Sequence, residues 1–247
     1  FSTPFDRTAV DFLANLGNPI FKIASFEITD IPLIEYAASM GKPMIISSGI
    51  ATLGEIEDAI AACRRSGNDD ITILKCTSAY PAPLEESNLL TMQDMKARFG
   101  VKVGLSDHCM GDVAVMTAVA LGATVIEKHF IIDRSVGGPD SSFSMEPKEF
   151  ALMVKNIREV EKCLGSVSYE LSDKMRNNRK FSRSLFAVKD IKKGDVFTEE
   201  NIRSIRPGDG ISPKYLPLLL GRKSPMDISF GNPLSLDLLQ QEFILEG

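Results

Sequence analysis

The chain has 247 residues, of which 44% are hydrophobic and 25% charged, and its formal net charge at pH 7 is −5. This composition is ordinary for a globular protein of one large domain or two smaller ones, and the acidic balance argues against nucleic acid as the main partner. No apolar run reaches the roughly 18 residues that a membrane-spanning helix needs, so we expect no membrane association.

The first residues, FSTPFDRTAV, carry neither an initiator Met nor a secretory pattern. They read as the end of a strand followed by a loop, so we expect the natural protein to begin before Phe1. The four cysteines, Cys63, Cys76, Cys109 and Cys163, form no CxxC pair. This usage favours free thiols in a reducing cytoplasm.

Short apolar strands alternate with helical patterns through the first two thirds of the chain. Strands are predicted over 20–25, 43–48, 71–77, 101–107 and 124–130, and helices over 6–16, 30–40, 54–65, 86–98, 111–121 and 147–164. This alternation is typical of βαβ units and a parallel sheet. An open doubly wound sheet is possible, but no GxGxxG loop accompanies it. We therefore predict the last five strands of an α/β fold, the (β/α)8 TIM barrel, with the other strands before Phe1.

The sequence pattern changes after residue 163. Residues 164–181 are polar and weakly periodic, which is typical of a linker. Between 182 and 247, short β-like runs are separated by the turn sequences KKGD and RPGDG. We predict a barrel domain over 1–163, a linker over 164–181 and a small β-rich domain over 182–247, whose modest core would pack on another surface.

His108 in GLSDHCM and His129 in IEKHF are the only two histidines of the chain. Both stand at the carboxyl ends of consecutive predicted strands, the edge where parallel βαβ folds place their active sites. Neighbouring strand ends would let the imidazoles converge and hold a divalent ion such as Mn, Fe, Co or Zn, with positions left for water and substrate. The alternative is two partly buried structural histidines; the matched placement favours the metal.

Four charged residues interrupt the apolar strands: Lys22, Lys75, Glu127 and Lys128. A buried charge needs a partner or a ligand. Lys75 and Glu127 would pair with each other, or the charged positions would face outward, or Lys22 would bind an anion at the mouth of the barrel. Hydroxyls at strand ends (Ser25, Ser47 and Ser106) add donors suited to a phosphate or carboxylate, although a single serine there is more often a cap.

Two loops follow predicted strands on the same edge. The Gly/Pro-rich segment 134–147 contains Asp140 and follows Asp133, and CTSAYPAP places Tyr80 beside the presumed site. The alternative for the first segment is a surface loop without a role. No GKS/T phosphate loop and no GxSxG elbow occurs, which disfavours nucleotide hydrolysis and serine esterase chemistry.

Several motifs occur in order along the chain: STPFD, FKIASFE, IISSG, CTSAYPAP, GLSDH, EKHF, GGPDSSFSM, SLFAVKDIKKG and IRPGDG. Together they resemble the sialic acid synthase family of bacterial nonulosonic acid synthases, over almost the whole chain. Within that family, FKIASFE and NRKFSRSLFAVKDIKKGD look most like the pseudaminic acid synthases, whereas the other branches more usually read YKIGSGE at the first of these sites.

The resemblance implies a barrel followed by a small antifreeze-like (SAF) domain. It also implies condensation of phosphoenolpyruvate with an acetamido-deoxy hexose, for this branch 2,4-diacetamido-2,4,6-trideoxy-altrose, to a nine-carbon nonulosonic acid with release of phosphate. The implied cofactor is a divalent metal, Mn²⁺ before Mg²⁺ or Co²⁺. The implied assembly is a cytoplasmic, domain-swapped homodimer.

The same resemblance assigns roles to individual residues. His108 and His129 would hold the metal, and Arg206 would reach the site of a partner subunit. The residues expected to contact phosphoenolpyruvate are Lys22, Thr3, Ser25, Ser47 and Ser106. Those expected beside the sugar are Glu27, Tyr80 and Asp140, and Lys22, Glu27 and Asp140 form the expected catalytic set.

The chain departs from the family pattern at one motif. The usual TN reads TS here, with Ser78 in place of the amide, so we expect different sugar contacts at this point. A family glutamate and a further substrate-binding lysine would precede Phe1. The alternatives are an N-acetylneuraminate or legionaminate synthase, a spore-coat polysaccharide relative, or an inactive fragment whose SAF domain serves as a binding module.

Overall fold

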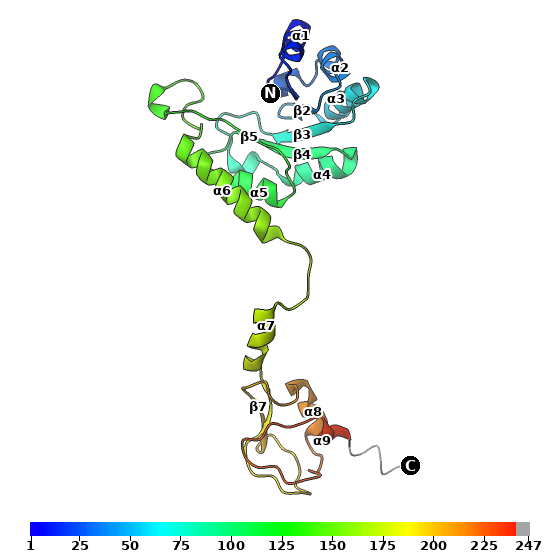
Figure 1. Ribbon diagram of the computed structural model, residues 1–247, viewed down its shortest axis with the longest axis vertical. Coiled ribbons are helices and arrows are strands. Elements are labelled where there is room, and N and C mark those ends of the chain that lie inside the picture. Colours follow the sequence, from blue (N-terminus) through cyan, green and yellow to red (C-terminus); the bar gives the residue numbers. More distant parts are fainter. Residues whose placement is uncertain (241–247) are drawn as a thin grey trace. The chain divides into compact units, whose positions relative to one another are not determined.

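The computed structural model describes residues 1–240. They belong to two compact units, one from Phe1 to Ser166 and one that starts at Val167 (Figure 1). No helix among these residues is long and apolar enough to cross a membrane.

The first unit is built on a parallel sheet of five strands that follow one another in chain order. The strands are β1 (Phe21–Ile23), β2 (Met44–Ser47), β3 (Ile71–Cys76), β4 (Lys102–Asp107) and β5 (Ile126–Lys128). The helices are α1 (Arg7–Asn15), α2 (Ile31–Ser39), α3 (Leu53–Arg65), α4 (Leu90–Phe99), α5 (Val113–Ala120) and α6 (Pro147–Leu164). The sheet and its crossover helices confirm the predicted part of a (β/α)8 barrel.

Alternate residues of each strand face opposite sides of the sheet. One side carries apolar side chains such as Ile23, Ile46 and Ile73, which are fully buried in the core shared with the helices. The other side, the interior of the curl, carries polar residues including Lys22 and Ser106. The apolar core therefore lies outside the curled sheet, and the interior is left free to carry polar groups.

β1 and β5 each end two residues earlier than predicted. β1 gives way to the 3-10 helix η1 (Ser25–Glu27), and β5 stops at Lys128, so Ser25 and His129 lie just beyond strands. The helix predicted over 86–98 begins at Leu90, because Leu84–Glu86 form the separate 3-10 helix η2. These shorter strands leave the chain free to turn at the edge where the candidate site lies.

The second unit has its own small core. It contains α7 (Asp173–Asn178), η4 (Arg179–Phe181), η5 (Pro213–Tyr215), α8 (Leu216–Leu219), α9 (Asp237–Gln240), and an antiparallel pair, β6 (Ser184–Ala187) with β7 (Ile202–Ile205). Leu185, Phe197 and Leu219 are fully buried in its core. The segment predicted as a linker thus includes the helix α7, and Ser172 is its N-cap because the Ser172 hydroxyl accepts a bond from Met175 N. Residues 241–247 lie outside the described residues.

Candidate functional site

Polar side chains gather at the carboxyl ends of the strands, inside the curl. Cys76 is opposite Ser106 in the register of β3 and β4, and Ser106 is opposite Glu127 in the register of β4 and β5. His108 and His129 follow two residues after Ser106 and Glu127, respectively. The parallel register therefore aligns one row of polar residues and carries both imidazoles just above it.

Lys22 and Glu127 form an ion pair across the interior, with Nζ 2.5 Å from Oε2. Ser106 Oγ donates to the other carboxylate oxygen of Glu127 at 2.7 Å. Burial alone would raise the pKa of Glu127, but Lys22 and the Ser106 hydroxyl outweigh burial and lower it. The alternative pairing of Lys75 with Glu127 is therefore wrong.

The ring of His108 is fixed by the backbone. Its Nδ1 lies 2.8 Å from the carbonyl oxygen of Thr77. A carbonyl only accepts, so Nδ1 carries the proton and the lone pair is placed on Nε2. Burial lowers the pKa of His108, but bonds with Cys76 and the Thr77 carbonyl outweigh it and raise the pKa above its usual value.

His129 faces His108 from the next strand end. The two ring centroids are 5.2 Å apart, with the planes inclined at 69°. Nδ1 of His129 lies 3.7 Å from Oδ2 of Asp140, so the Gly/Pro-rich loop brings this carboxylate to the site. Burial and the neighbouring His108 lower the pKa of His129, which favours the neutral imidazole that a metal ion requires.

Aromatic rings wall the two histidines. The ring centroid of Tyr80 is 4.3 Å from that of His108, and the ring centroid of Phe143 is 4.9 Å from that of His129. The sequence analysis identified Tyr80 but missed Phe143. The only hint of Phe143 in the sequence was a single aromatic residue within the polar loop GGPDSSFSM. In the structure this residue is buried.

The serines crowd around one backbone position. Ser25 Oγ accepts a bond from Ile50 N at 3.0 Å and lies 3.1 Å from Ser78 Oγ. Gly49 sits against both hydroxyls, and a Cβ at this position would lie 2.1 Å from Ser78 Oγ. Ser78, which replaces the family's amide, is therefore part of the same cluster.

Two buried polar atoms within residues 1–240 lack a hydrogen-bond partner: Oε2 of Glu27 and Oγ of Ser47. Both residues were predicted to contact substrate. A buried acceptor without a partner costs about 1–3 kcal/mol, so an isolated protein has no stability reason to keep such atoms. These two atoms are therefore the polar atoms at the strand-end cluster whose hydrogen bonding is left unsatisfied within the described residues.

Three other charged residues do not join the interior. Lys75 is on the outer side of the sheet, where Nζ donates to the Cys76 carbonyl at 2.8 Å and to Thr77 Oγ1 at 3.3 Å. Lys128 also faces outward and pairs with Asp107. Asp133 is exposed and accepts a bond from Ser135 N, so it caps the loop instead of contacting the site.

The remaining predicted residues lie at the margins. Thr3 is half-buried, and the preceding Ser2 forms a parallel bridge with Phe21, next to Lys22. Arg206 is exposed in the second unit, at the end of β7, and makes no hydrogen bond or ion pair with the part of the chain that the structure describes. Thr3 is thus beside the site, whereas the first unit does not itself contain the arginine.

The two histidine side chains are suitable ligands for a metal ion that keeps open coordination positions. Among residues 1–240, no group of three or more His, Cys, Asp or Glu side chains is arranged to hold a metal. If a metal ion binds here, its protein ligands would be the two imidazoles, His108 through Nε2 and His129, with the other positions left to water and substrate. Imidazole ligands with open positions suit Mn²⁺, Co²⁺ or Zn²⁺.

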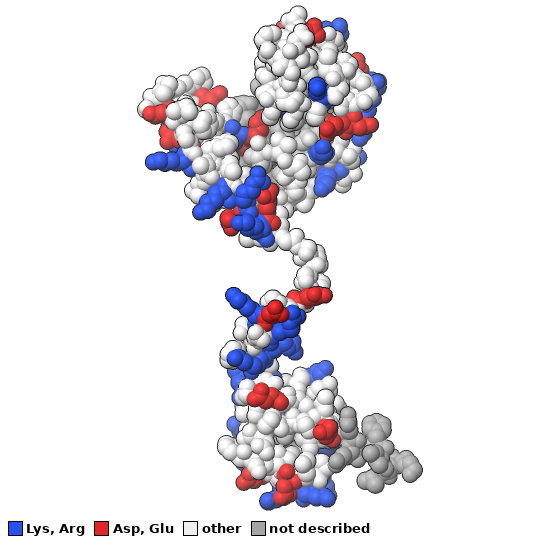
Figure 2. All heavy atoms as spheres, in the orientation of Figure 1, with Lys and Arg blue, Asp and Glu red and all other residues white. Residues whose placement is uncertain are grey.

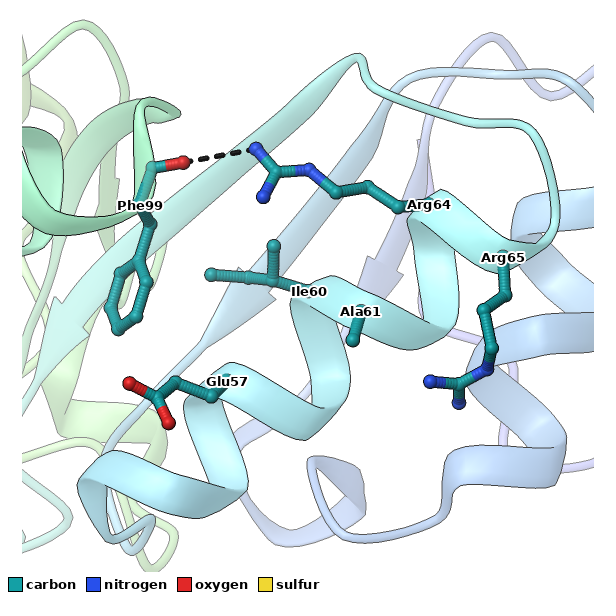
Figure 3. A pocket seen from close by; sticks show the side chains of 6 residues that line it. All are labelled: Glu57, Ile60, Ala61, Arg64, Arg65 and Phe99. Carbon is teal, nitrogen blue, oxygen red and sulfur yellow. Dashed lines mark hydrogen bonds between the residues drawn. The ribbon is translucent and has the colours of Figure 1, made fainter.

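A cavity of about 550 Å³ lies elsewhere, on the outer layer beside α3. Figure 3 shows Arg64 bonded to the carbonyl of Phe99, with Glu57 at the opposite end. Arg64 also pairs with Asp69, so its charge is already compensated. This cavity contains no arrangement of acid, base or nucleophile, and the strand-end cluster remains the candidate site.

Both units of the chain match sequence families of known proteins. Residues 1–169 match the NeuB family, and residues 182–240 match the SAF domain. The chain is 47% identical over 242 residues to a pseudaminic acid synthase of Helicobacter pylori, with 98% of this chain and 71% of the relative covered. It is 45% identical over 224 residues to an N,N'-diacetyllegionaminic acid synthase of Campylobacter jejuni, with 90% and 67% covered.

A solved structure is similar as well. The spore coat polysaccharide biosynthesis protein SpsE of Bacillus subtilis superposes with a TM-score of 0.63 at 35% identity, over 97% of this chain and 72% of that one. The fold and the matches define a parallel-barrel synthase joined to a SAF domain. The chain belongs to the NeuB family, which confirms the resemblance read from the sequence motifs.

We expect Gly49→Ala to destabilise the first unit, because the new Cβ would force Ser25 and Ser78 apart. Overpacking of this kind costs about 1–3 kcal/mol. Gly54→Ala is the matched control, since nothing lies within 4 Å of its Cβ and Ala is favoured over Gly in a helix by up to about 1 kcal/mol. Urea unfolding measures both; wild-type stability in Gly49→Ala would contradict the described packing.

Proposed function

We propose that this chain condenses phosphoenolpyruvate with 2,4-diacetamido-2,4,6-trideoxy-altrose to give a nine-carbon nonulosonic acid. C3 of the enol bonds to the aldehyde carbon of the open-chain sugar, water adds to C2, and phosphate leaves. The observation that carries the proposal is the convergence of two imidazoles, one lysine and several hydroxyls at one barrel edge, with Glu27 and Ser47 left without internal partners.

Lys22 and the strand-end hydroxyls would bind phosphoenolpyruvate. An ammonium group has three donors, and Glu127 uses one of those of Lys22, so the pair orients the lysine without exhausting it. Ser47 Oγ and Ser106 Oγ are on the same inner face, and the half-buried Thr3 lies beside β1. Fixed donors of this kind hold a dianion and bring the enol to attack distance of the aldehyde.

Glu27, Tyr80 and Asp140 would contact the sugar. Oε2 of Glu27 is a free acceptor for a hydroxyl or amide N–H, Tyr80 offers an aromatic face beside His108, and Asp140 lies next to His129. His108 and His129 would hold a divalent ion, Mn²⁺ by preference. Such an ion acts as a Lewis acid on a carbonyl oxygen or orients the attacking water.

The choice of sugar rests on sequence. The branch motifs FKIASFE and NRKFSRSLFAVKDIKKGD favour the pseudaminic branch, and the Helicobacter pylori relative is named for that product. The legionaminic acid synthase is almost equally similar, so the panel of sugars in the experiment below includes its substrate class. The free thiols favour a cytoplasmic location for this chemistry.

The assembly that we propose is a domain-swapped homodimer. Arg206 is exposed and without an internal partner, and basic side chains gather around α7, upstream in the same unit (Figure 2). These are Lys174, Arg176, Arg179, Lys180 and Arg183. In the swapped arrangement Arg206 of the partner subunit would complete the sugar end of the site.

Phosphate release from phosphoenolpyruvate tests the reaction directly. With Mn²⁺ and a panel of acetamido hexoses, we expect release with the 2,4-diacetamido-trideoxy sugar above all others. His108→Ala and His129→Ala should each reduce turnover and Mn²⁺ binding by more than the 10–100-fold typical of losing only a ligand's supporting partner, with circular dichroism unchanged. Release without any sugar, or undiminished turnover in both variants, would contradict the assignment.

Arg206→Ala should raise the KM for the sugar by about 10–100-fold, the worth of one hydrogen bond to a charged group, and leave the KM for phosphoenolpyruvate unchanged. Arg203→Ala, which changes an exposed arginine on β7 three residues before Arg206, is the control.

Mixed dimers test whether Arg206 acts in the site of the partner subunit (in trans) or in the site of its own chain (in cis). Combining Arg206→Ala chains with His108→Ala chains should create one fully intact site in each mixed dimer and restore the wild-type KM. In the cis arrangement no site would be intact, and absence of restoration would rule out the swap.

A further inference from the structure

A second ion pair joins β4 and β5 on the outer side of the sheet. Asp107 Oδ2 lies 2.6 Å from Lys128 Nζ, and the two side chains are only 2% and 1% exposed. The residues are directly opposite in the strand register. Each immediately precedes one of the two histidines, so the last register position of both strands is fixed by a charge pair.

The same pair also holds the turn that follows His108. Asp107 Oδ1 accepts a bond from Cys109 N at 2.9 Å, and Lys128 Nζ donates to the carbonyl of Cys109. Both peptide groups that flank Cys109 are therefore held by the pair. His108 is then constrained from two sides, through its backbone by this pair and through its ring by the Thr77 carbonyl.

Stability gives no reason for this arrangement. Removing two charges from water is costly, and neutral side chains of similar volume often replace a buried pair with no loss, or even with a gain, in stability. Leu105, which precedes Asp107 by two residues on the same face of β4, is buried in the apolar core. The charge pair instead fixes the geometry between the carboxyl ends of β4 and β5.

We propose that Asp107 and Lys128 are positioning residues that set the separation and orientation of the two imidazoles. The inference rests on the proposed metal-binding role of His108 and His129. Neither residue touches the interior of the barrel, because strand alternation directs Ser106 and Glu127 inward and their neighbours outward. The pair acts through the backbone, and it makes tight metal binding depend on a contact on the far side of the sheet.

The double variant Asp107→Asn/Lys128→Met tests this. Asn retains an acceptor for Cys109 N, and no buried charge is left behind. Met leaves the Cys109 carbonyl without its donor, so we expect a folded protein with a lower urea-unfolding midpoint. We expect the Mn²⁺ Kd to rise by about 10–100-fold, the range for supporting partners of metal ligands. The matched control is Asp70→Asn/Lys102→Met, which removes an exposed pair of 2.8 Å at the other end of β4 and should leave the Kd unchanged.

Each outcome is decisive. A folded double variant that binds Mn²⁺ as tightly as the wild type overturns the positioning role. If the double variant does not fold, Asp107→Asn/Lys128→Gln replaces it, because this variant also leaves no buried charge and retains a donor near the Cys109 carbonyl, and an unchanged Kd there has the same meaning. If the wild type binds no Mn²⁺, the proposed metal role fails, and the pair is judged on metal-free protein by ¹⁵N NMR of His108: loss of the single Nδ1–H tautomer in the double variant supports positioning, and its retention overturns it.

Discussion

The ion pair between Lys22 and Glu127 is the contact on which the site depends. It joins β1 and β5, the first and last strands of a five-stranded sheet. In a flat sheet these strands would be roughly 19 Å apart, four spacings of about 4.8 Å, beyond the combined reach of the two side chains. The pair therefore requires a curled sheet, and the curl turns the interior side chains toward a common centre where the two imidazoles lie.

Strand alternation divides the polar residues of two short motifs between two tasks. In SDH and EKH, Ser106, His108, Glu127 and His129 face the interior, whereas the intervening Asp107 and Lys128 face the helices. The interior set offers donors, acceptors and imidazoles to a ligand. The outer set holds the strand ends that carry them. Each motif thus combines a chemical group and its support within three residues, which explains why charged residues interrupt otherwise apolar strands.

Local patterns predicted much of this structure, and contacts between distant segments were the part that sequence could not supply. The βαβ alternation and the shared strand edge of His108 and His129 follow from periodicity and strand ends, which are local. The partner of Glu127 is 105 residues away; the sequence suggested Lys75 as that partner, and only the curvature of the sheet brings Lys22 to it instead. Phe143 was missed for the same reason, because a lone aromatic in a polar loop does not show which ring it packs against.

We propose that two imidazoles, held by two charge pairs at the strand ends, share one metal ion at the carboxyl edge of the barrel. Anomalous scattering at the manganese absorption edge, from crystals of the protein grown with Mn²⁺, tests it most directly. We expect a single strong peak between the rings of His108 and His129, on the side of His108 Nε2. A peak at any other group of side chains, with none between these rings, would contradict it.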